Sequence, residues 1–156
     1  MKDETINGTM TERMDIGSQE FKDFQLLIRA KAENLPTDVK NRMEMYTLKL
    51  KMIQYLKTNN LKIRSVGYYL KQALTKLKIK QNKFAAYIDL KPPNLTKIIK
   101  DQRKINMEQA LIFEKIFQID AEIWLRIQTK KDLSDLEKVN KNEFKKYSLK
   151  DLVYDG

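Results

Sequence analysis

Apolar residues recur at intervals of three and four along most of the chain, the spacing that places them on one face of an α-helix. Short segments of this kind follow one another between Val66 and Lys131, and we count five. Alternation typical of a strand is confined to residues 61–64. The pattern therefore predicts an all-α protein, with at most one short strand near residues 61–64.

Two further helices are predicted before residue 60, after a polar, non-periodic stretch over residues 1–17 that we interpret as a disordered lead-in. Ser18 can cap the first helix, and Pro36, which has no N–H to donate, ends it. Steps of four and three link the apolar positions of the second helix: Val39, Met43, Tyr46, Leu50 and Ile53. This seam is either the core-facing side of an amphipathic helix, which we favour, or a short coiled-coil contact. Residues 18–60 are thus predicted to form a helical extension.

The middle of the five segments has the layout of a helix-turn-helix. Asp89-Leu90-Lys91 is the predicted turn between a helix over residues 81–88 and a helix that begins at Pro92. Ala85 is small, as is required where two helices cross closely, and Leu90 supplies an apolar plug for the turn. Proline suits the first position of a helix because no backbone hydrogen bond is lost there.

Polar residues mark the expected starts of the later helices. Asn106 and Gln109 have the spacing of a capping box, and Asp120 is expected to cap the next helix. Ser134 begins a second match to the capping-box pattern and predicts another helix start. The predicted organisation is a lead-in over residues 1–17, a helical extension over 18–60, a helix-turn-helix domain over 61–131 and a charged tail over 132–156.

Composition removes several classes of function. The 156 residues include no cysteine and no histidine, which excludes disulfide scaffolds, thiol nucleophiles, zinc fingers and histidine-based acid–base catalysis. Small basic ribonuclease toxins can work with lysine, arginine and tyrosine and without histidine. Their folds resemble antiparallel sheets packed by helices, and strand patterning is nearly absent here, so this class of enzyme is disfavoured. We therefore predict no enzyme, with no catalytic residue, no metal ligand and no cofactor.

Positive charge is concentrated in the helix-turn-helix segment. The chain carries 31 basic and 21 acidic residues, a net charge of +10, and residues 61–105 alone, with 12 basic and 2 acidic residues, also hold +10. A local field of this size indicates a polyanionic partner, of which nucleic acid is the default, whereas the alternative is a solvated lysine-rich surface. Apolar stretches fall far short of the ~20 residues of a transmembrane helix, and no secretory signal is recognised, so a cytoplasmic protein is expected.

Several motifs of residues 66–128 occur together in one family. They are Gly67-Tyr68-Tyr69-Leu70, Gln81-Asn82-Lys83-Phe84-Ala85, Asn94-Leu95-Thr96-Lys97-Ile98-Ile99, Arg103-Lys104-Ile105, Gln109-Ala110-Leu111 and Ala121-Glu122-Ile123-Trp124-Leu125, followed by Gln128. In this order and spacing they resemble the phage-repressor/Cro-like (XRE) helix-turn-helix family, and within it the HigA-type antitoxin branch. The resemblance implies a five-helix, phage-repressor-like DNA-binding domain.

The resemblance also implies that residues 92–100 form the recognition helix. The side chains expected to contact DNA are polar: Gln81, Lys83, Lys91, Asn94, Thr96, Lys97, Lys100, Gln102, Arg103 and Lys104. Asn94 can bond an adenine edge and Lys97 can donate to guanine, whereas the residues after the helix are expected to meet backbone phosphates. Trp124 is expected to serve in packing, and it is the first candidate for a dimer interface.

Four residues depart from the family pattern. Asp89 and Asp101 stand where relatives usually have glycine, although aspartate tolerates a left-handed backbone better than most residues. Pro92 and Pro93 open the recognition helix at positions where relatives often read bases. Proline has no donor for a base, although it can still contact a thymine methyl group.

These features predict a sequence-specific transcriptional repressor that binds palindromic double-stranded DNA as a homodimer. By resemblance it is the antitoxin of a HigB/HigA-like pair, which represses its own operon and neutralises a small basic ribonuclease toxin. Residues 18–58 and the acidic groups of the tail are candidate surfaces for such a toxin. The alternative, which we favour slightly, is that residues 18–58 pack on their own domain or on the dimer mate. The alternative is a stand-alone regulator, or a protein-interaction module, without a toxin partner.

Overall fold

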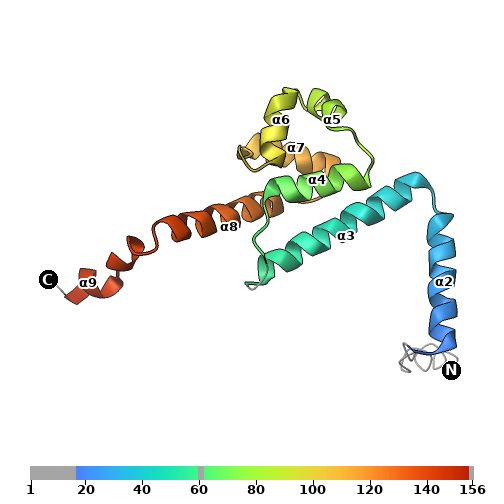
Figure 1. Ribbon diagram of the computed structural model, residues 1–156, viewed down its shortest axis with the longest axis horizontal. Coiled ribbons are helices and arrows are strands. Elements are labelled where there is room, and N and C mark those ends of the chain that lie inside the picture. The colour runs from blue at the N-terminus through green and yellow to red at the C-terminus, as the bar shows by residue number, and fades with distance from the viewer. Residues whose placement is uncertain (1–16, 60–61, 155–156) are drawn as a thin grey trace, which may run out of the picture. The chain divides into compact units, whose positions relative to one another are not determined.

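The computed structural model describes residues 17–59 and 62–154, and every regular element in these two ranges is helical (Figure 1). In chain order the elements are α2 (Gln19–Glu33), α3 (Thr37–Lys57), α4 (Val66–Lys76), α5 (Gln81–Tyr87), α6 (Pro92–Ile99), α7 (Met107–Phe117), α8 (Ala121–Val139), the 3-10 helix η1 (Phe144–Lys146) and α9 (Leu149–Tyr154). The all-α class predicted from the sequence is confirmed.

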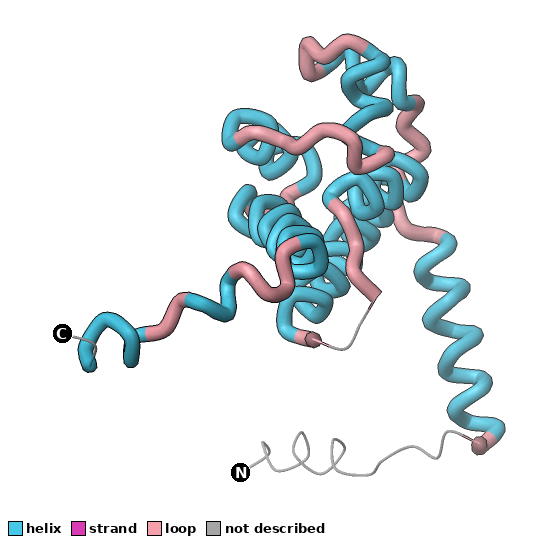
Figure 2. The backbone as a smooth tube through the Cα atoms, turned by 60° about the vertical axis from the view of Figure 1, so that its left-hand side comes forward, coloured by secondary structure: helices cyan, strands magenta, loops and turns pink. Residues whose placement is uncertain are grey.

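Short loops join the successive helices, and no strand occurs in the described chain (Figure 2). Residues 62–65 have no regular structure, so the described part of the segment 61–64 holds no strand. The lead-in predicted over residues 1–17 lies, apart from Gly17, outside the described residues. Among the helices that are described, none is both long enough and apolar enough to cross a membrane.

The chain divides into two compact units, residues 1–40 and 41–156. The first unit contains α2, which begins as predicted because the Ser18 hydroxyl accepts a hydrogen bond of 3.1 Å from the Phe21 N–H. Pro36 follows the end of this helix, and α3 starts at Thr37. Apolar side chains of α2 are exposed: Phe24, Leu26, Leu27 and Ile28.

The second unit has one apolar core to which α3 to α8 all contribute. It includes four aromatic side chains that are each at most 2% exposed: Phe84, Phe113, Phe117 and Trp124. Their rings contact one another with centroid separations of 5.3 to 6.1 Å. Burial of side chains of this size stabilises a fold by roughly 1.5–3 kcal/mol each, so this cluster is a main source of stability for the domain.

α3 packs on this core through a different face from the one predicted. Its buried residues are Met45, Leu48, Met52 and Tyr55. In the predicted seam, by contrast, Met43, Tyr46 and Leu50 are 52%, 63% and 48% exposed. The core-facing assignment of that seam is therefore wrong. Apolar residues occupy both sides of α3, so their periodicity could not decide which side would be buried.

α4 and α6 approach each other so closely at Gly67 that no side chain fits between them. A Cβ at this position would overlap the carbonyl oxygens of Ile98 and Ile99 and lie 2.6 Å from the Ile99 carbonyl carbon. The start of α4 is fixed by Ser65, whose hydroxyl accepts a hydrogen bond of 3.1 Å from the Tyr68 N–H. The contact at Gly67 thus determines how close α6 lies to the core.

Two aspartates in the left-handed region form the tight turns at either end of α6. Asp89 has a φ of 53° and Asp101 a φ of 60°. The Leu90 N–H donates a hydrogen bond of 2.8 Å to the Ala85 carbonyl, and the Gln102 N–H donates one of 2.7 Å to the Lys97 carbonyl. Both bonds close a helix end in the way that glycine usually permits. The turn predicted at residues 89–91 is therefore confirmed.

The helix starts farther along the chain differ in part from the predicted ones. The capping box at Asn106 is present. The Asp120 side chain makes no capping bond, and the Glu114 carboxylate accepts a hydrogen bond of 2.8 Å from the Ala121 N–H in its place. α8 runs unbroken past Ser134, so the helix start predicted there is wrong. No proline or glycine interrupts this stretch, and a capping pattern alone does not end the helix that precedes it.

Replacing Gly67 by alanine should destabilise the protein. In an ordinary helix interior this change is stabilising by about 1 kcal/mol. Here the new methyl group must push α6 away, and overpacking of this kind costs roughly 1–3 kcal/mol. Urea unfolding measures the difference, with Thr75→Ala on the exposed side of α4 as the control. A variant about 1 kcal/mol more stable than the wild type, as in an ordinary helix interior, would show that α4 and α6 are not in close contact.

Candidate nucleic-acid interface

α6 presents a polar side opposite a buried one. Its buried side chains are Leu95 and Ile98, which are 1% and 2% exposed. Lys97 is exposed and Asn94 is half-buried, and their spacing of three residues places them on the same face. Thr96 is also half-buried, and its hydroxyl donates a hydrogen bond of 3.1 Å to the Pro92 carbonyl. Asn94 and Lys97 are therefore the side chains of this helix most open to a base.

The first turn of α6 offers no free N–H group. Pro92 and Pro93 have none, and the N–H groups of Asn94 and Leu95 both bond to the Lys91 carbonyl, at 2.9 and 3.2 Å. Many helices bind phosphate through free N–H groups at this end. In this helix, contacts with phosphate must come from side chains.

Most basic side chains around α5, α6 and the loop that follows have no carboxylate partner in the described chain. No ion pair within the described chain involves Lys78, Lys80, Lys83, Lys91, Lys97, Lys100 or Arg103. Gln81, another predicted contact, is exposed at the start of α5, where the first N–H groups have no helical partner. The predicted contacts are thus carried by two neighbouring helices (Figure 1) and one loop, and most of their charge is uncompensated.

The loop after α6 is tied to α8 by ion pairs. Lys104 bonds Asp132 at 3.1 Å, so part of the charge expected to meet phosphate is already neutralised. Lys131 bonds Asp101 at 3.0 Å and Asp135 at 2.6 Å. The hydrogen bonds to Asp135 and then Asp101 raise the pKa of Lys131, and the bond to Lys131 lowers the pKa of Asp135. Lys131 and Asp135 therefore stay charged at neutral pH, and Lys131 remains bonded to Asp101 of the loop.

The Gln128 side chain binds the backbone of the same loop. Its side-chain amide donates a hydrogen bond of 3.0 Å to the Ile105 carbonyl and accepts one of 2.8 Å from the Ile105 N–H. In the sequence, Gln128 stands out only as part of a motif, and nothing there indicates the pairing of Lys104 with Asp132. These partners are more than twenty residues apart, and no local pattern connects them.

Trp124, the first candidate for a dimer interface, lies inside the core. It has no exposed surface, and its ring centroid lies 5.3 Å from that of Phe113 and 5.9 Å from that of Phe117. Its indole N–H has no hydrogen-bond partner among the described residues. The side chain is thus packed within one chain, and any dimer contact by α8 must use the residues around it.

Comparisons with known proteins agree with this geometry. A family model described as helix-turn-helix (HTH_3) matches residues 70–124, which extend from α4 to the first turn of α8. An uncharacterized HTH-type transcriptional regulator of Haemophilus influenzae is 34% identical over 74 residues, which cover 47% of this chain and 69% of that protein. The chain belongs to the helix-turn-helix family of DNA-binding transcriptional regulators. No solved structure matches this helix-turn-helix regulator.

Replacing Gln128 by leucine should weaken DNA binding, although Gln128 is not among the residues expected to contact the DNA. The Ile105 N–H and carbonyl would lose their partners in a buried position, which costs roughly 1–3 kcal/mol of stability. Because the loop that carries Arg103 would loosen, affinity should fall equally for all duplexes. Urea unfolding and gel shift measure the two effects, with Gln25→Ala, an exposed change in α2, as control. A sequence-dependent loss would contradict a role confined to the loop.

Proposed function

We propose that this helix-turn-helix regulator is a sequence-specific repressor that binds an operator near its own gene. The observation that carries the proposal is the uncompensated positive charge on α5, α6 and the following loop. Asn94 and Lys97 read base edges in the major groove, while Gln81, Lys83, Lys91, Lys100, Gln102, Arg103 and Lys104 position the helix on the phosphates. Thr96, whose hydroxyl is bonded within α6, contributes a minor contact.

Gel shift with the DNA upstream of the gene tests this assignment. If six phosphates are contacted, log K against log salt concentration should have a slope of about −5. Lys97→Ala should change which sequence is preferred, with a cost of roughly 1–3 kcal/mol at the base concerned. Arg103→Ala should weaken binding to all sequences alike. Lys104→Ala should have a smaller effect than Arg103→Ala, because Lys104 is paired with Asp132. Binding that does not depend on salt would contradict the proposal.

We further propose that the regulator acts as a homodimer on a palindromic site, since one recognition helix covers only a few base pairs. Two exposed apolar surfaces favour self-association. One, on α8, comprises Leu133, Leu136 and Val139, and the other, on α3, comprises Met43, Tyr46 and Leu50. Light scattering should give twice the 18.5 kDa of one chain. Leu136→Glu and Tyr46→Glu, compared with each other, identify the surface used, and a strict monomer at high concentration would exclude both.

The finer proposal is that the regulator is an antitoxin of the HigA type with a small basic ribonuclease toxin as its partner. The exposed apolar side chains of α2 support a protein partner, because soluble proteins seldom leave an apolar patch of this size in water. Asp132 and Asp135 of the tail are already paired with Lys104 and Lys131, so the carboxylates of the tail that suit a basic partner are Glu137, Glu143 and Asp151. Pro92 and Pro93, which offer no donor to a base, favour instead a module that binds only protein.

Co-purification with the product of the adjacent gene separates these functions. Full-length protein should capture a small ribonuclease, and versions that lack residues 1–40 or 140–156 should capture less. Capture without DNA binding would favour the protein-interaction module. DNA binding without capture would leave a stand-alone regulator.

A further inference from the structure

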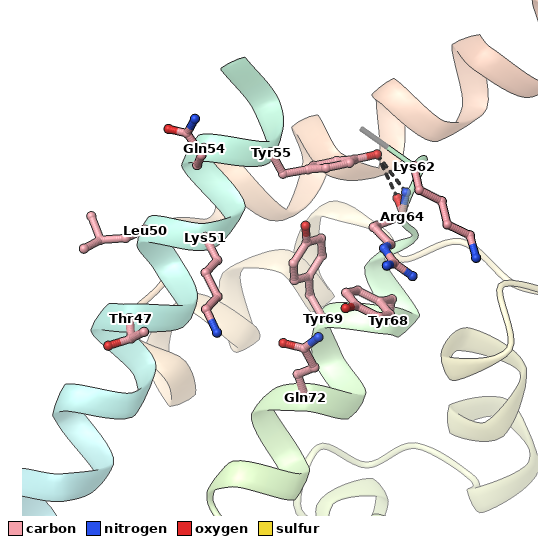
Figure 3. A pocket seen from close by; sticks show the side chains of 10 residues that line it. All are labelled: Thr47, Leu50, Lys51, Gln54, Tyr55, Lys62, Arg64, Tyr68, Tyr69 and Gln72. Carbon is pink, nitrogen blue, oxygen red and sulfur yellow. Dashed lines mark hydrogen bonds between the residues drawn. The ribbon is translucent and has the colours of Figure 1, made fainter. Parts of the chain in front are cut away.

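A cavity of about 650 Å³ opens between α3, α4 and the segment 62–65 (Figure 3). It lies away from the recognition helix. Tyr69 follows Gly67 by two residues, so at about 100° per residue it projects from nearly the opposite side of α4. Gly67 faces α6, whereas Tyr69 lines the cavity. The cavity is therefore separate from the candidate nucleic-acid interface, and its volume is in the range of small-molecule sites.

Three basic side chains line this cavity without a counterion. Lys51 comes from α3, and Lys62 and Arg64 come from the segment before α4. No carboxylate is among the lining residues, and none of the three cations forms an ion pair within the described chain. Glu44 on α3 is bonded to Lys76 at 3.0 Å and does not line the cavity. Uncompensated positive charge around a cavity favours an anionic ligand.

Aromatic rings line the same space. The ring of Tyr69 lies 5.7 Å from that of Tyr55 and 5.1 Å from that of Tyr68, measured between centroids. The guanidinium of Arg64 lies over the Tyr68 ring, with its central carbon 4.2 Å from the centroid. A flat cation stacked on a flat ring is a surface on which a further planar group can stack.

The hydroxyl groups of the tyrosines have different roles. The Tyr55 hydroxyl accepts a hydrogen bond of 2.9 Å from the Arg64 N–H and donates one of 3.2 Å to the Arg64 carbonyl, as Figure 3 shows. Tyr55 thus holds Arg64 in position. The Tyr69 hydroxyl, by contrast, bonds no described residue. Burial, with smaller contributions from Tyr55 and Tyr68, raises the pKa of Tyr69 to about 12, so its hydroxyl stays protonated and can donate.

The side-chain amide of Gln72 adds hydrogen-bonding groups to the cavity. The Gln72 side chain lines the cavity and makes no hydrogen bond within the described chain. It offers one acceptor and two donor hydrogens, the groups that pair with the edge of a nucleobase. The cavity therefore combines a cationic part, a stacking surface and hydrogen-bonding groups.

We propose that this cavity, the tyrosine pocket, binds a nucleotide. Lys51, Lys62 and Arg64 bind the phosphate, and Tyr69 and Gln72 bond the base or the sugar. The ligand is a regulator of DNA affinity, because the helix that carries Tyr68 and Tyr69 also carries Gly67. No space separates Gly67 from α6, so a displacement of α4 is transmitted to the recognition helix.

Calorimetry on the full-length protein tests the pocket with the four ribonucleoside monophosphates, ribose 5-phosphate, the uncharged nucleosides and inorganic phosphate. At least one monophosphate should bind tenfold or more tightly than inorganic phosphate or its own nucleoside, roughly the contribution of one charge-assisted hydrogen bond. The double change Lys51→Ala and Lys62→Ala should lower that affinity at least about tenfold. Lys57→Ala with Lys71→Ala removes the same charge from exposed positions of α3 and α4 outside the cavity and should have no effect.

Tyr69→Phe should weaken binding of the monophosphate but not of inorganic phosphate, with the folded state checked by circular dichroism. Absence of saturable binding, or equal binding by both double variants, would overturn the proposal. Inorganic phosphate that binds as tightly as every monophosphate would overturn the assignment to nucleotides.

The effect on DNA rests on the proposed repressor function and has its own readout. A saturating monophosphate should change the affinity for upstream DNA by about 5- to 150-fold, and the Lys51→Ala, Lys62→Ala variant should lose this response. Nucleotide binding without a change in DNA affinity would overturn the coupling. Nucleotide binding by a protein that binds no duplex would contradict the repressor function and leave the assignment of the pocket in place. DNA binding by a protein that binds no nucleotide would support the repressor function and overturn the assignment of the pocket.

Discussion

The absence of a side chain at Gly67 is the constraint on which the DNA-binding half of the molecule depends. It lets the backbone of α4 rest directly on the last turn of α6, which fixes the distance of α6 from the core. On its other side, α4 is held to α3 through Tyr55 and Tyr69, and Tyr55 in turn fixes the segment before α4. The position of α6 therefore depends on a series of contacts that extends through α4 to α3.

The loop after α6 depends on α8 in a comparable way. Gln128, Lys131 and Asp132 follow one another on that helix and bond the backbone of Ile105 and the side chains of Asp101 and Lys104. A loop held at three points loses little conformational freedom when it meets a phosphate, and the entropic cost of binding is correspondingly lower. Part of the charge is lost in exchange, since Asp132 neutralises Lys104.

Local chemistry made the helix-turn-helix predictable from the sequence. The turn at Asp89 and the capping box at Asn106 involve residues within a few positions of each other, so their patterns carry the information. The burial of α3 was not predictable in that way, because both of its sides are apolar and only the shape of the core selects one. The N-terminus of α8 is capped by Glu114 and not by the nearer Asp120, which the local pattern favours. The ion pairs between α8 and the loop after α6 join residues that are far apart in the sequence. The tyrosine pocket was missed for the same reason, although Arg64, Tyr68 and Tyr69 are near neighbours in the chain.

The prolines that open α6 have a further consequence for hydration. A helix end with free N–H groups must give up its bound water before it can enter a groove, and each group then needs a new partner. Pro92 and Pro93 carry no such groups, and the next two N–H groups are already bonded to Lys91. The leading end of this helix is therefore an apolar surface that can be dehydrated at little cost, and its polar side chains begin at Asn94, two residues after Pro92.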